Sequence, residues 1–464
     1  MAPPQDVSEA ERAAAAPVVD THLMTLVIAA AADRDGPMLR SLLAGLHPTD
    51  IADVLKNLPS HSLHTVIALV GKQLPPELLL ELPAETLGEV LKQMPASQIG
   101  AQLGQFDTDD AAVVAAAVEP SRLREVLAAT PEEARRAVEA GLSFEEETAG
   151  RLMQREFVAA PEFWSVGQTI DHLRDAADDD LPDIFFEIYV VDPAFRPVGA
   201  VRLSTLLRAS RATALRDLMQ APQFLVRPEM DQEEVAFAFQ RYHLASAPAV
   251  DEGGRLTGMV TVDDIVHVIR EESEEDLLRL SGVSEADQSD SVWRALRART
   301  PWLMVNMATA LTASSVITMF ETSINQMVSL AVLMPIVASL GGNAGTQSLA
   351  VAVRALAARD LTPMNTARFV GREALTGAFN GVVIALLLSM IAGVWFHSFS
   401  LALAAGLAVI FNLTCAGLAG SLVPLTLKRF GADPAVASSV FVTWMTDTVG
   451  FFAFLGIATA ILFH

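Results

Sequence analysis

The C-terminal third of the chain contains five apolar segments, each long enough to cross a bilayer. They run roughly over 300–320, 327–352, 371–396, 399–424 and 436–463. A hydrocarbon core about 30 Å thick needs about 20 apolar helical residues to cross it. Helices satisfy their own backbone hydrogen bonds, which lipid cannot do. Residues 299–464 are therefore predicted to form an α-helical transmembrane domain with five helices.

Charge divides the chain just as sharply. Residues 300–464 contain only six of the 32 Lys and Arg and five of the 55 Asp and Glu, so residues 1–299 carry essentially the whole net charge of −23. Such an acidic surface repels nucleic acid and attracts cations. We therefore expect a membrane protein with a large acidic soluble part that attracts cations, with lipid as a partner and no nucleic acid.

Basic residues set the expected orientation, because loops rich in Lys and Arg stay in the cytoplasm. All such loops fall on one side of the predicted spans. Their basic residues are Arg294, Arg297, Arg299, Arg354, Arg359, Arg368, Arg372, Lys428 and Arg429. The single cysteine, Cys415, fits a reducing compartment for the soluble part. We predict a multi-pass protein of the inner (plasma) membrane, with residues 1–299 cytoplasmic and the C-terminus outside.

The segment 37–147 contains an internal repeat, which follows a predicted N-terminal extension, 1–36. Asp53-Val-Leu-Lys-Asn-Leu-Pro59 recurs as Glu89-Val-Leu-Lys-Gln-Met-Pro95 and, more weakly, as Glu125-Val-Leu-Ala-Ala-Thr-Pro131. Apolar-periodic stretches that end at proline indicate short helices stopped by that proline. A fixed period of this size predicts a stacked α-helical repeat domain.

A second duplication, of a different kind, lies in 148–272. The stretch from Val191 to Val201 aligns with that from Val250 to Val260 at a constant offset of 59 residues. Each copy predicts a strand, a tight turn and a second strand, followed by a helix. Two such α+β units in tandem resemble a CBS-domain pair. A charged helix, 273–298, is predicted to connect this pair to the membrane.

The last apolar segment has one charged residue, Asp447, at its centre. A carboxylate at bilayer depth costs roughly 2.5–3.5 kcal/mol, so it usually faces a protein interior or a water-filled path. Ser439 and Thr443 lie on the same helical face. A hydroxyl stripe ending at a carboxylate suits a hydrated cation. The alternative is a buried aspartate that hydrogen-bonds to a neighbouring helix.

The second apolar segment contains Gly341-Gly342-Asn343-Ala-Gly345-Thr-Gln347. Glycine permits a local helix break that frees carbonyl groups for an ion. It also permits close packing of two helices, with Asn and Gln hydrogen-bonding between them. The sequence leaves both interpretations open for Gly342 and Asn343.

These motifs together resemble the MgtE family of magnesium transporters: the Gly-Gly-Asn-x-Gly-x-Gln element, Thr446-Asp447, Gly431-Ala-Asp433-Pro and the order of the domains. The resemblance implies a homodimer with one pore, in which Asp447 holds Mg²⁺ through its water shell and Asp433 lies at the cytoplasmic mouth. Mg²⁺ prefers oxygen ligands and dehydrates reluctantly, which agrees with that arrangement. The connecting helix would then plug the pore.

The resemblance also implies that Mg²⁺ binds the acidic cytoplasmic domains and closes the pore, as regulator as well as substrate. The family's sensor positions fall on Asp231, Glu233, Asp264, Glu272, Glu275 and Asp276. Asp109 and Asp110 of the helical repeat could supply partner carboxylates. His243 stands where the family has an acid. Each acid taken singly would also fit a solvated surface.

Other functions remain open on sequence alone. Thr261 and Asp264 fit a CBS nucleotide pattern, so ATP is a candidate ligand. A carrier coupled to H⁺ or Na⁺ would use Asp447 as its coupling acid. A membrane-anchored Mg²⁺ or nucleotide sensor would not transport at all. No catalytic set or phosphate-binding Gly-rich loop emerges from the sequence, so we do not expect an enzyme.

Overall fold

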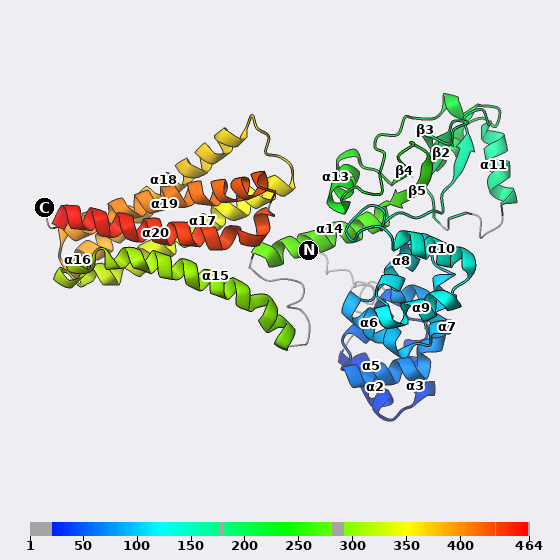
Figure 1. The fold of residues 1–464 in the computed structure, drawn as a ribbon, viewed down its shortest axis with the longest axis horizontal. Helices are drawn as coiled ribbons and strands as arrows, with labels where there is room; N and C mark the ends of the chain where they lie inside the picture. Colours follow the sequence, from blue (N-terminus) through cyan, green and yellow to red (C-terminus); the bar gives the residue numbers. More distant parts are fainter. Residues whose placement is uncertain (1–20, 177–180, 183, 281–291, 432, 463–464) are drawn as a thin grey trace, which may run out of the picture. The chain divides into compact units, whose positions relative to one another are not determined.

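The computed structural model describes residues 21–176, 181–182, 184–280, 292–431 and 433–462 (Figure 1). The chain divides into two compact units, Met1–Arg270 and Glu271–His464. The first holds the helical repeat and the paired β-units, and the second holds the apolar helices. Part of the predicted extension, 1–20, lies outside the described residues.

The first unit opens with short helices that share one hydrophobic core. They are α2 (Thr21–Ala32), α3 (Gly36–Leu43), α4 (Pro48–Lys56), α5 (Ser60–Val70), α6 (Ala84–Gln93), α7 (Ala96–Leu103), α8 (Thr108–Ala116), α9 (Pro120–Ala129) and α10 (Glu132–Gly141), with the 3-10 turns η1 (Gly71–Gln73) and η2 (Pro76–Leu79). Val27 and Ala31 of α2 are buried in this core. The helical domain therefore begins before residue 37, inside the predicted extension.

The repeated prolines Pro59, Pro95 and Pro131 act as the sequence predicts and do one thing more. Helices α4, α6 and α9 each end two or three residues before one of them. Each proline is also the N-cap residue of the next helix, and its carbonyl accepts the N–H four residues later. Proline suits this place because it has no N–H to leave unpaired and its φ is already close to helical.

Two β-hairpins follow, in separate sheets. The first sheet has the order β1-β2-β3, with β1 parallel and β3 antiparallel to β2, and the second pairs β4 and β5 antiparallel. The elements are β1 (Ala159–Pro161), α11 (Val166–Asp175), β2 (Glu187–Val191), β3 (Pro197–Arg202), α12 (Leu203–Arg208), η4 (Leu215–Asp217), α13 (Gln232–Tyr242), β4 (Ser246–Val250), β5 (Leu256–Thr261) and α14 (Val262–Leu280).

The two hairpins keep the predicted 59-residue offset down to single residues. Val190 pairs with Gly199 in the first and Ala249 with Gly258 in the second, and each register shifts at the next position. The turns also match, since Phe195 (φ 62°) and Gly254 (φ 78°) occupy the same left-handed position. The Phe195 carbonyl of the first hairpin accepts a hydrogen bond from the Leu256 N–H of the second hairpin, at 2.9 Å.

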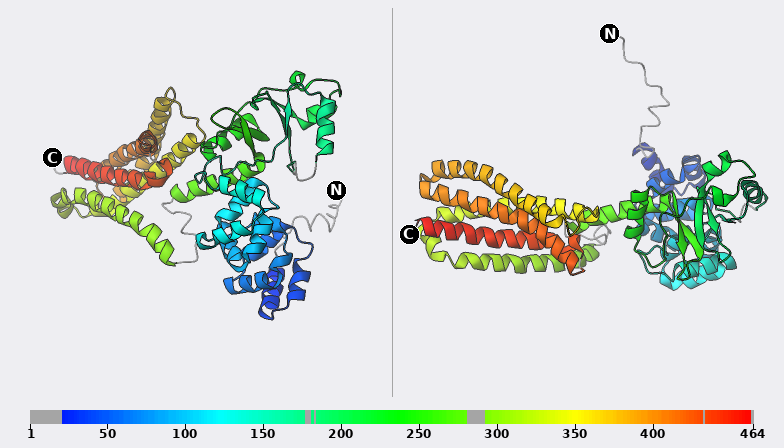
Figure 2. Two further views of the ribbon diagram at one scale, coloured as in Figure 1. Left: turned by 45° about the vertical axis from the view of Figure 1, so that its right-hand side comes forward. Right: turned by 90° about the horizontal axis from the view of Figure 1, so that it is seen from above.

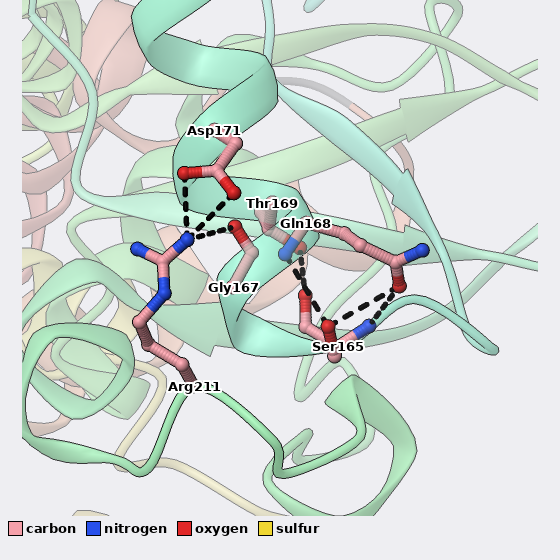
Figure 3. Close-up of polar contacts among 6 residues, drawn as sticks. All are labelled: Ser165, Gly167, Gln168, Thr169, Asp171 and Arg211. Atoms are coloured by element: carbon pink, nitrogen blue, oxygen red, sulfur yellow. Dashed lines mark hydrogen bonds and ion pairs between the residues drawn. The ribbon is translucent and has the colours of Figure 1, made fainter.

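Helix α11 is fixed at its start by a capping box and by one arginine (Figure 3). The Ser165 hydroxyl accepts the Gln168 N–H at 3.3 Å, and the Gln168 side chain accepts the Ser165 N–H at 2.9 Å. Arg211 reaches both Asp171 carboxylate oxygens, at 2.7 and 2.6 Å, and the Gly167 carbonyl at 3.3 Å. These bonds hold the helix of the first repeat against the segment that leads into the second.

The second unit consists mainly of long helices that run side by side (Figure 2). They are α15 (Val292–Thr318), α16 (Glu321–Gln326), α17 (Ser329–Ala357), α18 (Thr366–Phe396), α19 (Phe399–Arg429) and α20 (Pro434–Leu462). Helix α19 packs against α17, α18 and α20, and α15 lies on α20. Many alanines and glycines of α19 are buried in these contacts, which lets the neighbouring helices approach closely.

Among the described residues, four helices are long and apolar enough to cross a membrane: α17, α18, α19 and the part of α20 from Ser439 to Leu462. The multidomain membrane fold is confirmed, but the count of five spans is not. The predicted first span falls in α15, which is long enough but polar. Its hydroxyls bond back to the carbonyl three residues earlier, as Thr312 does to Thr309 at 2.7 Å and Ser315 to Thr312 at 2.6 Å.

The predicted connecting helix, 273–298, is described only in part. Helix α14 starts at Val262, inside the second β-unit, and is described as far as Leu280. Residues 281–291 lie outside the described part of the chain, and α15 already begins at Val292. The domain boundaries within 262–298 therefore stay predictions.

Candidate functional site

Asp447 lies in the middle of α20 and is only partly covered. Ser439 and Thr443 are also partly covered, which agrees with their predicted place on the same helical face as Asp447. Thr446, the preceding residue, is buried and donates its hydroxyl to the Thr443 carbonyl at 3.0 Å. Within the described residues the Asp447 carboxylate has no hydrogen bond or ion pair, so the alternative of an aspartate bonded to a neighbouring helix of the same chain is not observed.

The glycine motif of α17 packs against α19 and α20 and does not break the helix, which is continuous from Ser329 to Ala357. A Cβ at Gly341 would lie 2.2 Å from Asn412 Nδ2, and one at Gly345 would lie 2.6 Å from Val442 Cγ1. Side chains larger than hydrogen therefore cannot fit at either position. Of the two interpretations that the sequence allows for the glycines, close packing is the one present.

The other residues of the motif lie outside this close packing. Gly342 lies beside Thr446, since a Cβ on Gly342 would be 4.0 Å from Thr446 Oγ1. Asn343, Thr346 and Gln347 are exposed on the single chain. Among the described residues, neither Asn343 nor Gln347 makes the predicted hydrogen bond between helices. Polar side chains thus remain open on α17 at the level of Asp447 on α20.

Asn412, at the centre of α19, is a residue that sequence reasoning missed. It is fully buried, and its Nδ2 donates to the Val337 carbonyl of α17 at 2.9 Å. A Cβ at Gly450 of α20 would lie 2.7 Å from the same nitrogen. Asn412 is thus wedged between the glycines of α17 and α20 and fixes the two helices that carry Asn343 and Asp447. An amide inside an apolar span was the available signal.

Asp433, the residue before α20, is bound by a positive charge. The Arg279 guanidinium of α14 donates to Asp433 Oδ2 at 2.6 Å and also pairs with Glu275 one turn earlier. Asp433 and Glu275 are predicted site residues. Arg279, which the sequence analysis does not predict, pairs with both of them. Both partners of the Arg279–Asp433 pair are about one third exposed, at 33% each.

In the first unit, two predicted regulatory regions meet. Asp109 and Asp110 lie in the first turn of α8, and Asp264 lies in the first turn of α14. Asp109 is 6% exposed, and in its protonated form it donates a hydrogen bond to Asp264. Burial, followed by the charge of Asp264, raises the pKa of Asp109 well above its usual value. We call Asp109, Asp110 and Asp264 the carboxylate cluster.

The other members of the cluster are shifted in the same direction. Burial raises the pKa of Asp110 to about 6, and the Asp264 and Asp263 charges add to the effect. Burial also raises the pKa of Asp264 to about 6. Such groups stabilise a bound proton or cation, because their negative charges oppose one another. No three His, Cys, Asp or Glu side chains of the described residues are arranged as a preformed metal site.

The remaining predicted regulatory acids lie elsewhere. Asp231 is the N-cap residue of α13, and its carboxylate accepts the Glu233 N–H at 2.7 Å. Both side chains are exposed. Glu272 lies on α14 in the second unit, and the side chain of Asp276 lies outside the described part of the structure. The Asp231 carboxylate therefore caps its own helix.

The predicted nucleotide residues lie at the carboxylate cluster. Thr261 is buried and donates its hydroxyl to Asp264 at 2.7 Å, so both belong to the cluster. A cavity of about 240 Å³ lies instead between the repeats, lined by Glu187, Arg202, Thr205, His243 and Ser246 among others. Arg202 occupies the position that matches Thr261 in the first repeat. His243 is therefore part of this cavity, in a left-handed C-cap conformation after α13.

Comparison with known proteins identifies the chain's family. The profile described as "Divalent cation transporter" matches residues 334–457, the "MgtE intracellular N domain" matches 46–147, and a CBS domain matches 215–271. The magnesium transporter MgtE of Thermus thermophilus is 32% identical over 435 residues, covering 92% of this chain and 96% of that protein. The chain belongs to the MgtE family.

Further MgtE proteins agree. That of Enterococcus faecalis is 35% identical over 318 residues, 68% of this chain and 70% of that protein, and that of Bacillus subtilis is 27% identical over 432 residues, 92% and 95%. A solved cytosolic domain of the Mg²⁺ channel MgtE in complex with ATP shares 33% identity, with a TM-score of 0.48 over 53% of this chain and 99% of that one. The predicted family is confirmed, and MgtE proteins are transporters, as the absence of a catalytic set led us to expect.

Proposed function

We propose that this MgtE protein moves Mg²⁺ across the inner membrane as a Mg²⁺-selective channel, with Asp447 in the ion path. The observation that carries the proposal is Asp447 itself, a partly covered carboxylate at the middle of a span without a partner among the described residues. A charge at that depth is tolerated where water or a cation meets it. Carboxylates that hold the water shell of Mg²⁺ select the ion without stripping it.

The path is formed by two copies of the chain. Asn343 and Gln347 are exposed on α17, and Gly342, the neighbour of Asn343, lies beside Thr446, the residue before Asp447. Exposed amides are unfavourable in lipid, so a polar surface must cover them. A second copy placed against α17 and α20 supplies that surface and a second Asp447. A homodimer with five helices per chain, α15 included, would let the polar face of α15 meet protein or water.

Mg²⁺ would also regulate the channel from the cytoplasm. The carboxylate cluster is buried, and burial is the main reason that the pKa values of Asp110 and Asp264 are raised to about 6, with neighbouring negative charges adding to the effect. Bound Mg²⁺ would bridge these groups and favour the packed arrangement. The Arg279–Asp433 pair would hold α14 at the start of α20 and favour the closed state. ATP would bind in the cavity between the repeats, where Arg202 and Ser246 offer donors.

Mg²⁺ flux into proteoliposomes with no H⁺ or Na⁺ gradient tests the path. We expect flux through the wild type and through Glu321→Ala, a carboxylate outside the span, but not through Asp447→Ala. Flux that starts only when a gradient is applied would identify a coupled carrier. Silence under all conditions would favour a sensor that does not transport.

Cysteine cross-linking tests the dimer. In a Cys415→Ala background, Asn343→Cys should form a disulfide-linked dimer in the membrane. Leu375→Cys on α18, 61% exposed, is the matched control and should not. Equal cross-linking at both positions, or at neither, would contradict the proposed interface.

A further inference from the structure

A basic hollow lies where α17 ends and α18 begins. Its volume is about 520 Å³. Three arginines line it, Arg354 from the last turn of α17 and Arg368 and Arg372 from the first turns of α18, together with Asp360 and Asn365 of the connecting loop. Three positive charges and one negative charge thus surround a space large enough for a phosphate-bearing group.

The hollow has a fixed frame. Arg368 and Arg372 are one helical turn apart and therefore share a face of α18. Asn365 holds the loop, since its Nδ2 donates to the Asp360 carbonyl at 2.8 Å and its Oδ1 accepts the Thr362 N–H at 2.8 Å. The backbone between the helices is thereby pinned next to the arginines.

The guanidinium groups are largely uncommitted. Arg372 lies over the Phe369 ring at 5.3 Å and pairs with Glu373 at 3.2 Å. Neither Arg354 nor Arg368 has an ion pair in the part of the chain that the structure describes. The Asp360 side chain lines the hollow, so a bound anion would need to outweigh one carboxylate.

Beside the hollow, α18 presents an apolar stripe to the outside. Leu375, Phe379 and Val383 follow Arg372 along the same face and are 61%, 71% and 58% exposed. Val351 of α17, at the edge of the hollow, is 43% exposed. A basic site thus continues directly into a surface suited to hydrocarbon chains, which a free phosphate would not require.

We propose that this hollow binds the headgroup of an anionic phospholipid, with the acyl chains lying along α18. Arginine forks bind phosphate oxygens in a bidentate way and are weakly hydrated. Basic pockets between transmembrane helices at the membrane surface suit anionic headgroups. The site is distinct from the Asp447 path and does not depend on it.

Native mass spectrometry of the full-length protein tests the proposal, after reconstitution with equal amounts of phosphatidylglycerol and phosphatidylcholine. Wild-type protein should retain phosphatidylglycerol preferentially. Arg354→Gln combined with Arg368→Gln should reduce that preference by about 30-fold, since each arginine at an anionic surface contributes about fivefold. Lys428→Gln combined with Arg429→Gln removes the same charge from the next basic loop and should leave it unchanged.

Two further arms separate the remaining explanations. Arg354→Lys combined with Arg368→Lys keeps the charge but loses the fork, and should lower the preference by a smaller factor while showing that the protein still folds. Inorganic phosphate should not displace the lipid at millimolar concentration. Displacement by phosphate, an equal loss in the Lys428/Arg429 control, or an unchanged preference in the double Gln variant would each overturn the proposal.

Discussion

The carboxylates of the two units contrast in how far one chain completes their environment. In the first unit, Asp109, Asp110 and Asp264 lie together, buried, with hydrogen bonds from Thr261 and with one another. In the second, Asp447 is alone on its helix and only partly covered. The cluster is therefore assembled within one chain, whereas the Asp447 carboxylate has no partner among the described residues of that chain. In the function proposed above, the first arrangement suits sensing and the second suits conduction.

The largest effect is expected from Asp447→Asn, which keeps the shape and removes the charge. Losing one charge-assisted hydrogen bond to the Mg²⁺ water shell in each subunit, about 1.5–3 kcal/mol apiece, lowers flux by about 100-fold or more. Protection of the first unit from protease by Mg²⁺ should not change, because the cluster is intact. If Asp447→Asn abolished both Mg²⁺ flux and protease protection, the two regions would not have separate roles.

A smaller effect is expected from Asp109→Asn combined with Asp264→Asn. Removing two carboxylates should raise the Mg²⁺ concentration needed for protease protection by about 20-fold, because each charge-assisted contact contributes 1.5 kcal/mol or more and part of that gain is offset by relieved repulsion. Peak flux should be retained. Glu145→Gln combined with Glu146→Gln, two exposed acids of the same unit, makes the same charge change and should leave the midpoint within twofold.

Acidification tests the same cluster without mutation. The folded pKa values of Asp110 and Asp264, about 6, lie above the ordinary 3.8, so protonation stabilises the packed cluster. That contribution is complete below about pH 4 and is lost as the pH rises through 6. Protons and Mg²⁺ compete, so the midpoint for Mg²⁺ protection should rise about tenfold from pH 7.5 to 5.5. A midpoint independent of pH would show that these groups do not bind the ion.

The smallest effect is expected from Arg279→Gln. The pair with Asp433 is one third exposed, so screening limits its contribution to about 1 kcal/mol, a change of about fivefold in the balance of closed and open states. Flux at submillimolar Mg²⁺ should rise by up to that factor. Arg297→Gln, which removes an exposed arginine on α15, serves as the control. A fall in flux with Arg279→Gln would show that the Arg279–Asp433 pair favours the open state instead.

Local features of the fold could be read from the sequence because local patterns encode them. The 59-residue offset predicts both hairpins with their matching registers, and the repeated prolines predict where helices end. The apolar segments predict α17 to α20. The first predicted span, 300–320, is not among the four helices that are long and apolar enough to cross a membrane, so the count of five stays a prediction. Its hydroxyls bond back to carbonyl groups of their own helix, which a hydropathy pattern alone cannot show.

Pairing over long distances could not be read in the same way. Asp109 and Asp264 were each candidates, but their contact depends on how the helical repeat packs on the second hairpin. Arg279 and Asn412 belong to no recognisable motif. Their roles follow from the residues that they contact in the fold. Their partners, Asp433 and Gly341, were the residues that the patterns emphasised, so the sequence predicts one half of each contact.

The turn at Phe195 breaks the symmetry of the duplicated hairpins. Its partner Gly254 takes the left-handed conformation without strain, whereas Phe195 has a Cβ and incurs about 1–2 kcal/mol there. The bond from the Leu256 N–H to the Phe195 carbonyl and the contact of its ring with Phe157 at 6.4 Å offset that strain. The two turns are therefore not equivalent: the Phe195 turn is strained and bonded to the second hairpin, whereas the matching Gly254 turn takes the same conformation without strain.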